Sequence, residues 1–280
     1  MRWCAVILVV GMMASGAWAA SDEGGSCCLP FGKAWCGDAQ LPLPFGVGLT
    51  FYTQKQDYKL KSLELNPPLS LLMAMPLDMG VDLPAGAALP APTALELKNK
   101  ATDVDLQASA WVLPFLDVFA LLGDVDGETK VAIGAPIGTL DIDYHGLVYG
   151  GGATLAGAWQ ALFGSMTYTY TQTYLDEEDS SVTAWQWAPR VGFQFQPPCG
   201  CVERLSLGTG ATYQWAEEKH KGDVAVPVLG RVAYDVKLKD DKPWNYPATL
   251  AVDINKHWQA TLEAGFGDRT DWAGTVTYRF

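Results

Sequence analysis

The sequence predicts an all-β fold: a transmembrane antiparallel up-and-down β-barrel of about ten strands with long external loops. The last nine residues, Trp272 to Phe280, alternate between larger apolar side chains or glycine and small or polar ones. Successive side chains of an extended strand point to opposite faces, so this segment has one apolar face and one polar face. Hydrophobic residues make up 49% of the chain and charged residues only 18%. A closed barrel places such a surface against lipid and pairs every backbone group between its strands.

Ten alternating segments account for the strands. The clearest is 183–196, whose outward set includes Trp185, Trp187 and Phe193 and whose inward set includes Gln186 and Arg190. The segments are 45–56, 101–112, 117–125, 145–158, 161–174, 183–196, 204–216, 247–255, 258–267 and 271–280. The alternating stretch 224–239 is expected to form an external hairpin. If that stretch and 58–65 cross the membrane instead, the barrel has twelve strands.

The lengths of the connections support the same fold. Connections after the even-numbered segments are short, at 113–115, 160, 197–201 and 256–257, whereas most of the others are long, at 57–100, 126–144, 175–182 and 217–246. Membrane barrels have short periplasmic turns and longer external loops, so both ends of the barrel are expected in the periplasm. Residues 66–92, rich in Pro, Leu and Ala, form either a short amphipathic helix or an irregular cap.

The N-terminal residues predict export. A positive start, the apolar run 5–13 and the motif Ala17-Trp18-Ala19 are typical of a cleaved signal peptide over residues 1–19, with an N-terminal anchor as the alternative. Residues 20–44 then form a periplasmic segment that contains cysteines, and residues 45–280 form the barrel. The formal net charge of −12 argues against a nucleic-acid partner, because the chain offers no basic stripe for phosphates.

The C-terminal pattern also carries a resemblance. Val276, Tyr278 and the terminal Phe280 resemble the closing strand of Gram-negative outer-membrane β-barrels. That resemblance implies a location in the bacterial outer membrane, contact with outer-membrane lipid, and use of these three residues as the signal read by the barrel assembly machinery. Segments 109–118, 189–192, 242–246 and 256–269 are similar to a group of uncharacterised proteobacterial outer-membrane proteins, a group that implies no activity.

Charged residues fall on the inward faces of the predicted strands. They are Asp103, Asp105, Arg190, Asp253, Glu263 and Arg279, with Asp117 expected to join them. Side chains can nearly fill the interior of a barrel of this size, and charges buried there have to be paired. One hypothesis is therefore a structural or surface barrel with a largely filled, salt-bridged lumen. The alternative is a small passive channel for hydrophobic or small cationic solutes, lined by the surplus carboxylates.

Five cysteines remain after the signal peptide, and all lie on the predicted periplasmic side. Three belong to the N-terminal segment and two to the turn after the sixth strand: Cys27, Cys28, Cys36, Cys199 and Cys201. Because the periplasm is oxidising, disulfides that staple the segment to the turn are expected. A metal site is not predicted, because no histidine accompanies these cysteines.

Catalysis has little support in the sequence. His145, His220 and His257 are scattered, and no nucleophile motif accompanies them, so an outer-membrane enzyme is the least favoured hypothesis and no cofactor is expected. Two acidic clusters, 124–128 and 176–179, lack the full ligand set of a calcium loop. We interpret them as solvated loop tips.

Overall fold

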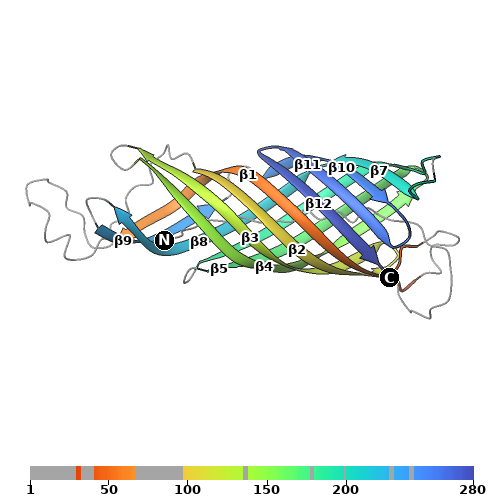
Figure 1. Cartoon of the computed structure of the whole chain (residues 1–280), viewed down its shortest axis with the longest axis horizontal. Helices are drawn as coiled ribbons and strands as arrows, with labels where there is room; N and C mark the ends of the chain where they lie inside the picture. The colour runs from red at the N-terminus through yellow and green to blue at the C-terminus, as the bar shows by residue number, and fades with distance from the viewer. Residues whose placement is uncertain are drawn as a thin grey trace, which may run out of the picture.

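The computed structural model describes residues 30–32, 41–66, 97–134, 138–176, 180–198, 200–226, 230–239 and 243–280. These residues form one antiparallel β-sheet that closes on itself as a barrel (Figure 1). None of the described segments is a helix with the length and apolar character needed to cross a membrane. The predicted signal peptide and the stretch 67–96, which contains most of the first long loop, lie outside the described residues.

Twelve strand segments make up the wall. They are β1 (Phe45–Asn66), β2 (Leu97–Leu113), β3 (Leu116–Gly134), β4 (Gly138–Trp159), β5 (Leu162–Leu175), β6 (Ser181–Phe195), β7 (Arg204–Gly210), β8 (Thr212–Val226), β9 (Gly230–Lys239), β10 (Trp244–Asp253), β11 (Trp258–Gly267) and β12 (Arg269–Arg279). Two pairs of these segments are halves of single wall strands. β7 and β8 meet at Ala211 and both pair with β6, while β9 and β10 both pair with β8. The wall therefore has ten strands, and the prediction of ten rather than twelve is confirmed.

The last strand closes the barrel on the first. β12 pairs with β1 from Gly46↔Arg279 to Gln56↔Arg269. Beyond the ladder, the backbone amide of Phe280 donates to the carbonyl of Phe45 at 2.9 Å, and the amide of Phe45 donates back at 3.1 Å. The C-terminal residue thus completes the seam, so no sheet edge is left open at this end.

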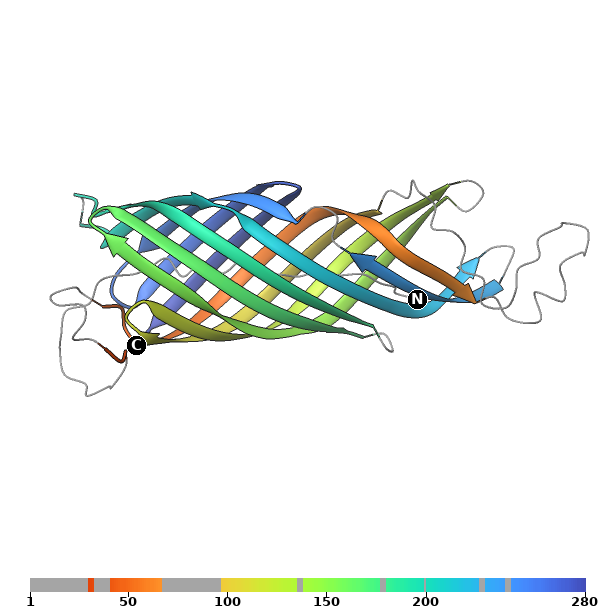
Figure 2. The same ribbon diagram turned by 180° about the vertical axis from the view of Figure 1, so that it is seen from behind.

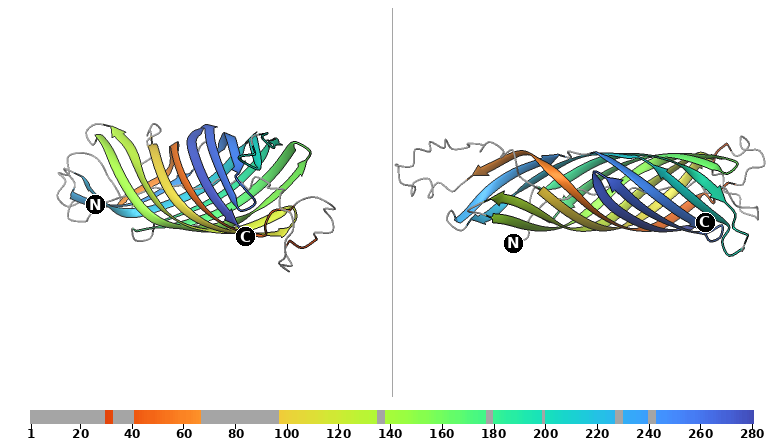
Figure 3. Two further views of the ribbon diagram at one scale, coloured as in Figure 1. Left: turned by 45° about the vertical axis from the view of Figure 1, so that its right-hand side comes forward. Right: turned by 90° about the horizontal axis from the view of Figure 1, so that it is seen from above.

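The wall is inclined and has two levels. Figure 2 and Figure 3 show the strands crossing the long axis of the barrel at a slant, as closure with a register shift requires. The β11–β12 hairpin ends early, at Gly267–Arg269, and beyond it the outer part of β1 pairs with β9, from Lys59↔Lys239 onward. Ten strands therefore surround the half of the barrel that holds the C-terminus, and eight (β1–β6, β8 and β9) surround the extension beyond the β11–β12 tip.

The outer face is apolar and the inner face is polar. Along β6, Trp185, Trp187 and Phe193 are exposed on the outside, whereas Gln186 and Arg190 are buried inside, as predicted. Aromatic side chains gather toward both ends of the wall. Tyr149 and Tyr174 stack 5.6 Å apart, and at the other end Trp258 and Tyr278 lie 5.0 Å apart, measured between ring centroids. Such girdles mark the two lipid interfaces of membrane barrels.

The external connections differ from the prediction. The sequence predicts a loop over 126–144, but β3 continues to Gly134 and β4 begins at Gly138, so most of this stretch is a long hairpin. Its alternation is masked by charged residues on the outward face, because this part of the wall stands beyond lipid. The predicted external hairpin at 224–239 is present as the turn between β8 and β9. On the opposite side, the tight turn at residue 160 is confirmed, with Gln160 at φ 54°.

Candidate functional site

The candidate site is the lumen, where ten charged side chains are buried among the residues that the structure describes. Six are carboxylates and four are arginines: Asp103, Asp105, Asp117, Asp253, Glu263, Asp271, Arg190, Arg204, Arg269 and Arg279. Every charged residue that the sequence placed on an inward face lies in this set. Sequence reasoning missed Arg204, Arg269 and Asp271. The signal was available for all three, because the inward repeat of β12 continues back from Ala273 through Asp271 to Arg269, and that of β7 continues back from Ser206 to Arg204.

Arg190 and Glu263 form the central ion pair. The Arg190 Nη2 lies 3.0 Å from Glu263 Oε1, and both side chains are almost completely buried. The guanidinium also donates to the carbonyl of Ala211 at 2.6 Å and to the hydroxyl of Thr212 at 2.8 Å. Arg190 therefore stabilises the backbone at the break between β7 and β8. It also neutralises Glu263, which comes from β11, on the other side of the wall strand that β7 and β8 form. Thr249 gives Glu263 a further hydrogen bond at 3.2 Å.

A second ion pair lies at the tip of the short β11–β12 hairpin. The Nε of Arg269 lies 2.8 Å from Asp271 Oδ2, and Arg269 Nη1 also donates to the side-chain oxygen of Gln214. Asp271 accepts from Asn245 Nδ2 at 2.7 Å and from the Tyr52 hydroxyl at 3.1 Å. Side chains from β1, β8, β10 and β12 thus meet across the lumen at this level.

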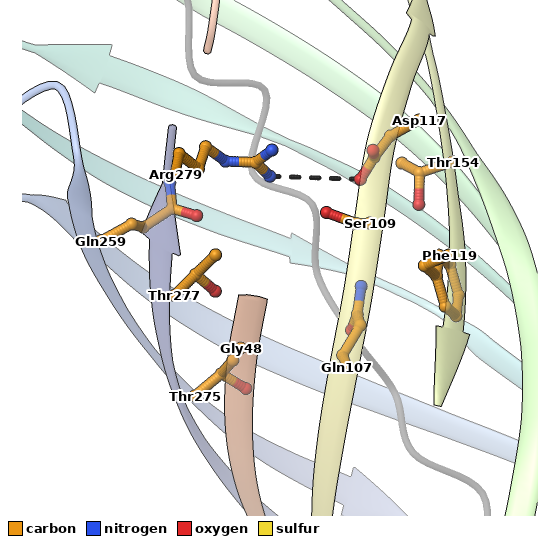
Figure 4. A pocket seen from close by; sticks show the side chains of 10 residues that line it. All are labelled: Gly48, Gln107, Ser109, Asp117, Phe119, Thr154, Gln259, Thr275, Thr277 and Arg279. Atoms are coloured by element: carbon orange, nitrogen blue, oxygen red, sulfur yellow. Dashed lines mark ion pairs between the residues drawn. The ribbon is translucent and has the colours of Figure 1, made fainter. Parts of the chain in front are cut away.

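Two further pairs lie toward the end of the barrel that holds the C-terminus. Arg204 Nε is 3.6 Å from Asp253 Oδ2, and Asp253 also accepts from Gln259 at 2.6 Å. Arg279 Nη2 is 4.0 Å from Asp117 Oδ2, a looser contact drawn in Figure 4.

The space left beside these pairs is small. The cavity between Arg279 and Asp117 has a volume of ≈ 20 Å³, which is room for about one water molecule. Another cavity of ≈ 20 Å³ lies beside Arg279 and Asp253. A hollow of ≈ 360 Å³ lies on β2 to β4 around Tyr144 and His145, and one of ≈ 450 Å³ lies on β1 to β3 beside the β11–β12 tip at Arg269. Side chains therefore occupy most of the lumen at the level of the ion pairs.

Two lumen carboxylates have no such partner. Asp103 and Asp105 are 1% and 0% exposed, and no described residue donates a hydrogen bond to any of their four oxygens. Among the described residues the lumen thus carries two more buried carboxylates than arginines.

A separate polar cluster lies on the outer face, past the Tyr149–Tyr174 pair. His145 Nε2 is 3.1 Å from Asp124 and its Nδ1 is 3.2 Å from Asp176. Slight burial lowers the pKa of His145, but Asp124 and Asp126 outweigh it, so the pKa lies above its ordinary value. The sequence predicts Asp124 and Asp126 on a loop tip, whereas the structure places them on β3. With His145 they bring three ligand-type atoms within 4.8 Å of one another, at the solvent-facing surface.

The other predicted residues are placed as follows. Val276, Tyr278 and Phe280 all point outward and are exposed at the C-terminal end of β12. Cys201 is disulfide-bonded, but Cys27, Cys28, Cys36 and Cys199 lie outside the described residues, so the proposed staple stays a prediction. The amide of Phe31 donates to the carbonyl of Val112 at 2.9 Å, which brings part of the N-terminal segment against the β2–β3 turn.

A closed wall, an apolar outer face with two aromatic girdles and a polar charged interior together define a bacterial outer-membrane β-barrel protein. No protein-family model and no curated protein matches the chain.

Solved structures similar to the chain are themselves outer-membrane proteins or transporters. The outer membrane protein OprG from Pseudomonas aeruginosa is 12% identical with a TM-score of 0.43, and the match covers 86% of this chain and 98% of that one. The toluene transporter TbuX from Ralstonia pickettii is 8% identical with a TM-score of 0.31, covering 86% and 90%. The COG4313 outer membrane channel from Pseudomonas putida F1 is 10% identical with a TM-score of 0.29, covering 86% and 97%.

Proposed function

We propose that the protein is a narrow passive channel of the outer membrane that passes small solutes and prefers cations. The excess of lumen carboxylates carries this proposal: in the part of the chain that the structure describes, six buried carboxylates face four buried arginines, and the two that remain, Asp103 and Asp105, have no described hydrogen-bond donor. A lumen that served packing alone gains nothing from buried, unpaired charges, because each of them costs free energy. Rings or clusters of carboxylates favour the passage of cations.

In the described conformation the ion pairs narrow the path. Conduction therefore needs a rearrangement of side chains, most simply around Arg279 and Asp117, whose contact at 4.0 Å is the longest of the four pairs. The guanidinium of Arg279 leaves its Nε and Nη1 without hydrogen-bond partners among the described residues and lies 5.8 Å from the ring centroid of Trp111. Few bonds thus oppose its movement.

The second candidate is a structural or surface barrel with a permanently filled lumen. The observation that favours it is the small size of the cavities beside the ion pairs, ≈ 20 Å³ each. In this candidate the ion pairs only fix how the side chains of the interior pack. The parts of the hairpins that extend beyond the membrane are then the functional surface, in contact with the surroundings of the cell.

Planar-bilayer recording of the refolded mature chain separates the two candidates. A channel gives steady openings in the wild type, with a larger unit conductance in the Arg190→Ala/Arg279→Ala variant. A filled barrel is silent in the wild type at every voltage and conducts only after that double substitution. Anomalous migration of the unboiled proteins on a gel serves as the folding control, so silence from unfolded protein is not counted.

A further inference from the structure

The charges of the lumen leave one pair of carboxylates unaccounted for. Each of the four arginines contacts a different carboxylate: Arg190 with Glu263, Arg204 with Asp253, Arg269 with Asp271, and Arg279 with Asp117. Only Asp103 and Asp105 remain among the buried carboxylates of the described residues.

These two residues are neighbours on one face of β2. Residues two apart in a strand point the same way, so both carboxyl groups enter the lumen side by side. They stand close enough for one to hydrogen-bond the other if it held a proton. Two like charges are therefore concentrated at one place, level with Thr50 and Tyr52 of β1.

The adjacent strands supply no counter-charge. Asp103 is paired across the sheet with Tyr52 and Val125, and the Tyr52 hydroxyl donates instead toward Gln54 and Asp271. Asp105 is paired with Thr50 and Gly123. The Thr50 hydroxyl is engaged with Thr275 at 3.0 Å.

The wall is shaped around one of these carboxylates. A Cβ atom on Gly123 would overlap the carboxyl group of Asp105, so the absence of a side chain at position 123 makes the space that this carboxylate occupies. The carboxylate therefore has a specific place over the wall, although no described donor satisfies it there.

A buried pair of carboxylates needs either a cation or a proton to neutralise it. An all-oxygen ligand set suits hard cations such as Ca²⁺ and Mg²⁺, and two carboxylates match the charge of one divalent ion. We propose that Asp103 and Asp105 together bind one divalent, oxygen-preferring cation inside the barrel. This site does not depend on the proposed channel function. Ion binding can be measured on the protein in detergent, without any measurement of conductance.

The test counts bound metal on the folded chain. The mature protein is refolded in detergent with Ca²⁺ or Mg²⁺ present, which lets the ion enter before the barrel closes, and is then dialysed and analysed by atomic emission. We expect about one ion per chain in the wild type, and at least a tenfold lower occupancy in the Asp103→Asn/Asp105→Asn variant. The single variant Asp105→Asn, with one carboxylate left and refolded in the same way, should show an intermediate occupancy.

The matched control is Asp124→Asn/Asp126→Asn, which removes the same charge from the exposed cluster on the outer face. It should keep the lumen ion. The proposal is overturned if the wild type retains no ion, which assigns a shared proton to the pair, or if only the control variant loses metal. Retention of metal by the Asp103→Asn/Asp105→Asn variant overturns it equally. A silent bilayer recording with the ion still bound refutes the channel alone.

Discussion

The Arg190–Glu263 pair offers the sharpest test of how the lumen holds the barrel together. Replacing Arg190 by Met keeps an apolar stem but leaves Glu263 buried without its cation. Removal of one member of a buried ion pair costs about 3–5 kcal/mol. The burial of both side chains, 2% and 8% exposed, places this pair in that class rather than among the weak surface pairs.

The contribution of the charge can be separated from that of the remaining hydrogen bonds. Arg190 also donates to Ala211 and Thr212, at 2.6 and 2.8 Å, and these bonds are lost whatever the charge at position 263. In a Glu263→Gln background we therefore expect Arg190→Met to cost only about 1–2 kcal/mol. The difference between the two backgrounds, about 2 kcal/mol, is the coupling between the two residues.

Urea unfolding of the four proteins in lipid vesicles, followed by tryptophan fluorescence, measures this cycle. The reasoning fails if Arg190→Met lowers the free energy of unfolding by less than about 1 kcal/mol, since a lone buried carboxylate costs more than that. It fails equally if Arg190→Met costs the same in the wild-type background and in the Glu263→Gln background. A parallel recording of β7 and β8 amide exchange should show the interruption at Ala211 opening first.

Three further outcomes follow from the structure. Gly123→Ala should destabilise the barrel by about 1–3 kcal/mol through overlap with the neighbouring carboxylate, whereas Gly157→Ala, whose new Cβ meets nothing within 4 Å, should be near neutral in the same unfolding assay. The raised pKa of His145 means that its stabilising contribution is present below the pKa of the unfolded chain and is lost as the pH rises through the folded pKa. An NMR titration should find that pKa lowered by Asp124→Asn, and an unchanged value would contradict the contact. Deletion of Phe280 should reduce the amount of barrel in the outer membrane of cells while leaving refolding into detergent intact, and equal losses in both would argue for a purely structural role.

The alternation of the sequence was sufficient to predict the wall within the membrane. Trp185, Trp187 and Phe193 could be assigned to lipid and Gln186 and Arg190 to the lumen because the two environments differ so sharply in polarity. Beyond the membrane the outward positions are charged, as at Asp124 and Asp126, while inward positions such as Val125 and Tyr144 are buried, so the apolar outward stripe that marks a lipid-facing strand is missing. For that reason the sequence predicts a loop for the hairpin of β3 and β4, although its strands pair from Leu116↔Leu155 to Gly134↔Gly138.

The sequence did not predict which lumen charges form ion pairs with one another. Arg190 on β6 meets Glu263 on β11, with two wall strands between them, so the contact depends on the closure and stagger of the whole barrel. The alternation predicted that both residues face inward. It did not predict which carboxylate each arginine contacts, or which carboxylates have no arginine partner. The interruption at Ala211 was also missed, because the alternation of residues 204–216 gives no sign of a break there.

The two proposals for the lumen make opposite demands on ion selectivity, and this conflict can be measured. With six buried carboxylates and four buried arginines, the described part of the empty lumen is negative, which favours K⁺ over Cl⁻. A divalent ion on Asp103 and Asp105 cancels that excess. We therefore expect the reversal potential in a KCl gradient to show cation preference in the presence of a chelator, and Ca²⁺ to reduce both the preference and the K⁺ current. The Asp103→Asn/Asp105→Asn variant should have the ion selectivity of the Ca²⁺-loaded wild type, both with and without chelator. The reason is that its lumen has already lost the two excess negative charges. If chelator leaves the wild-type selectivity unchanged, or if the variant keeps the full cation preference, the two carboxylates do not control what passes through this barrel.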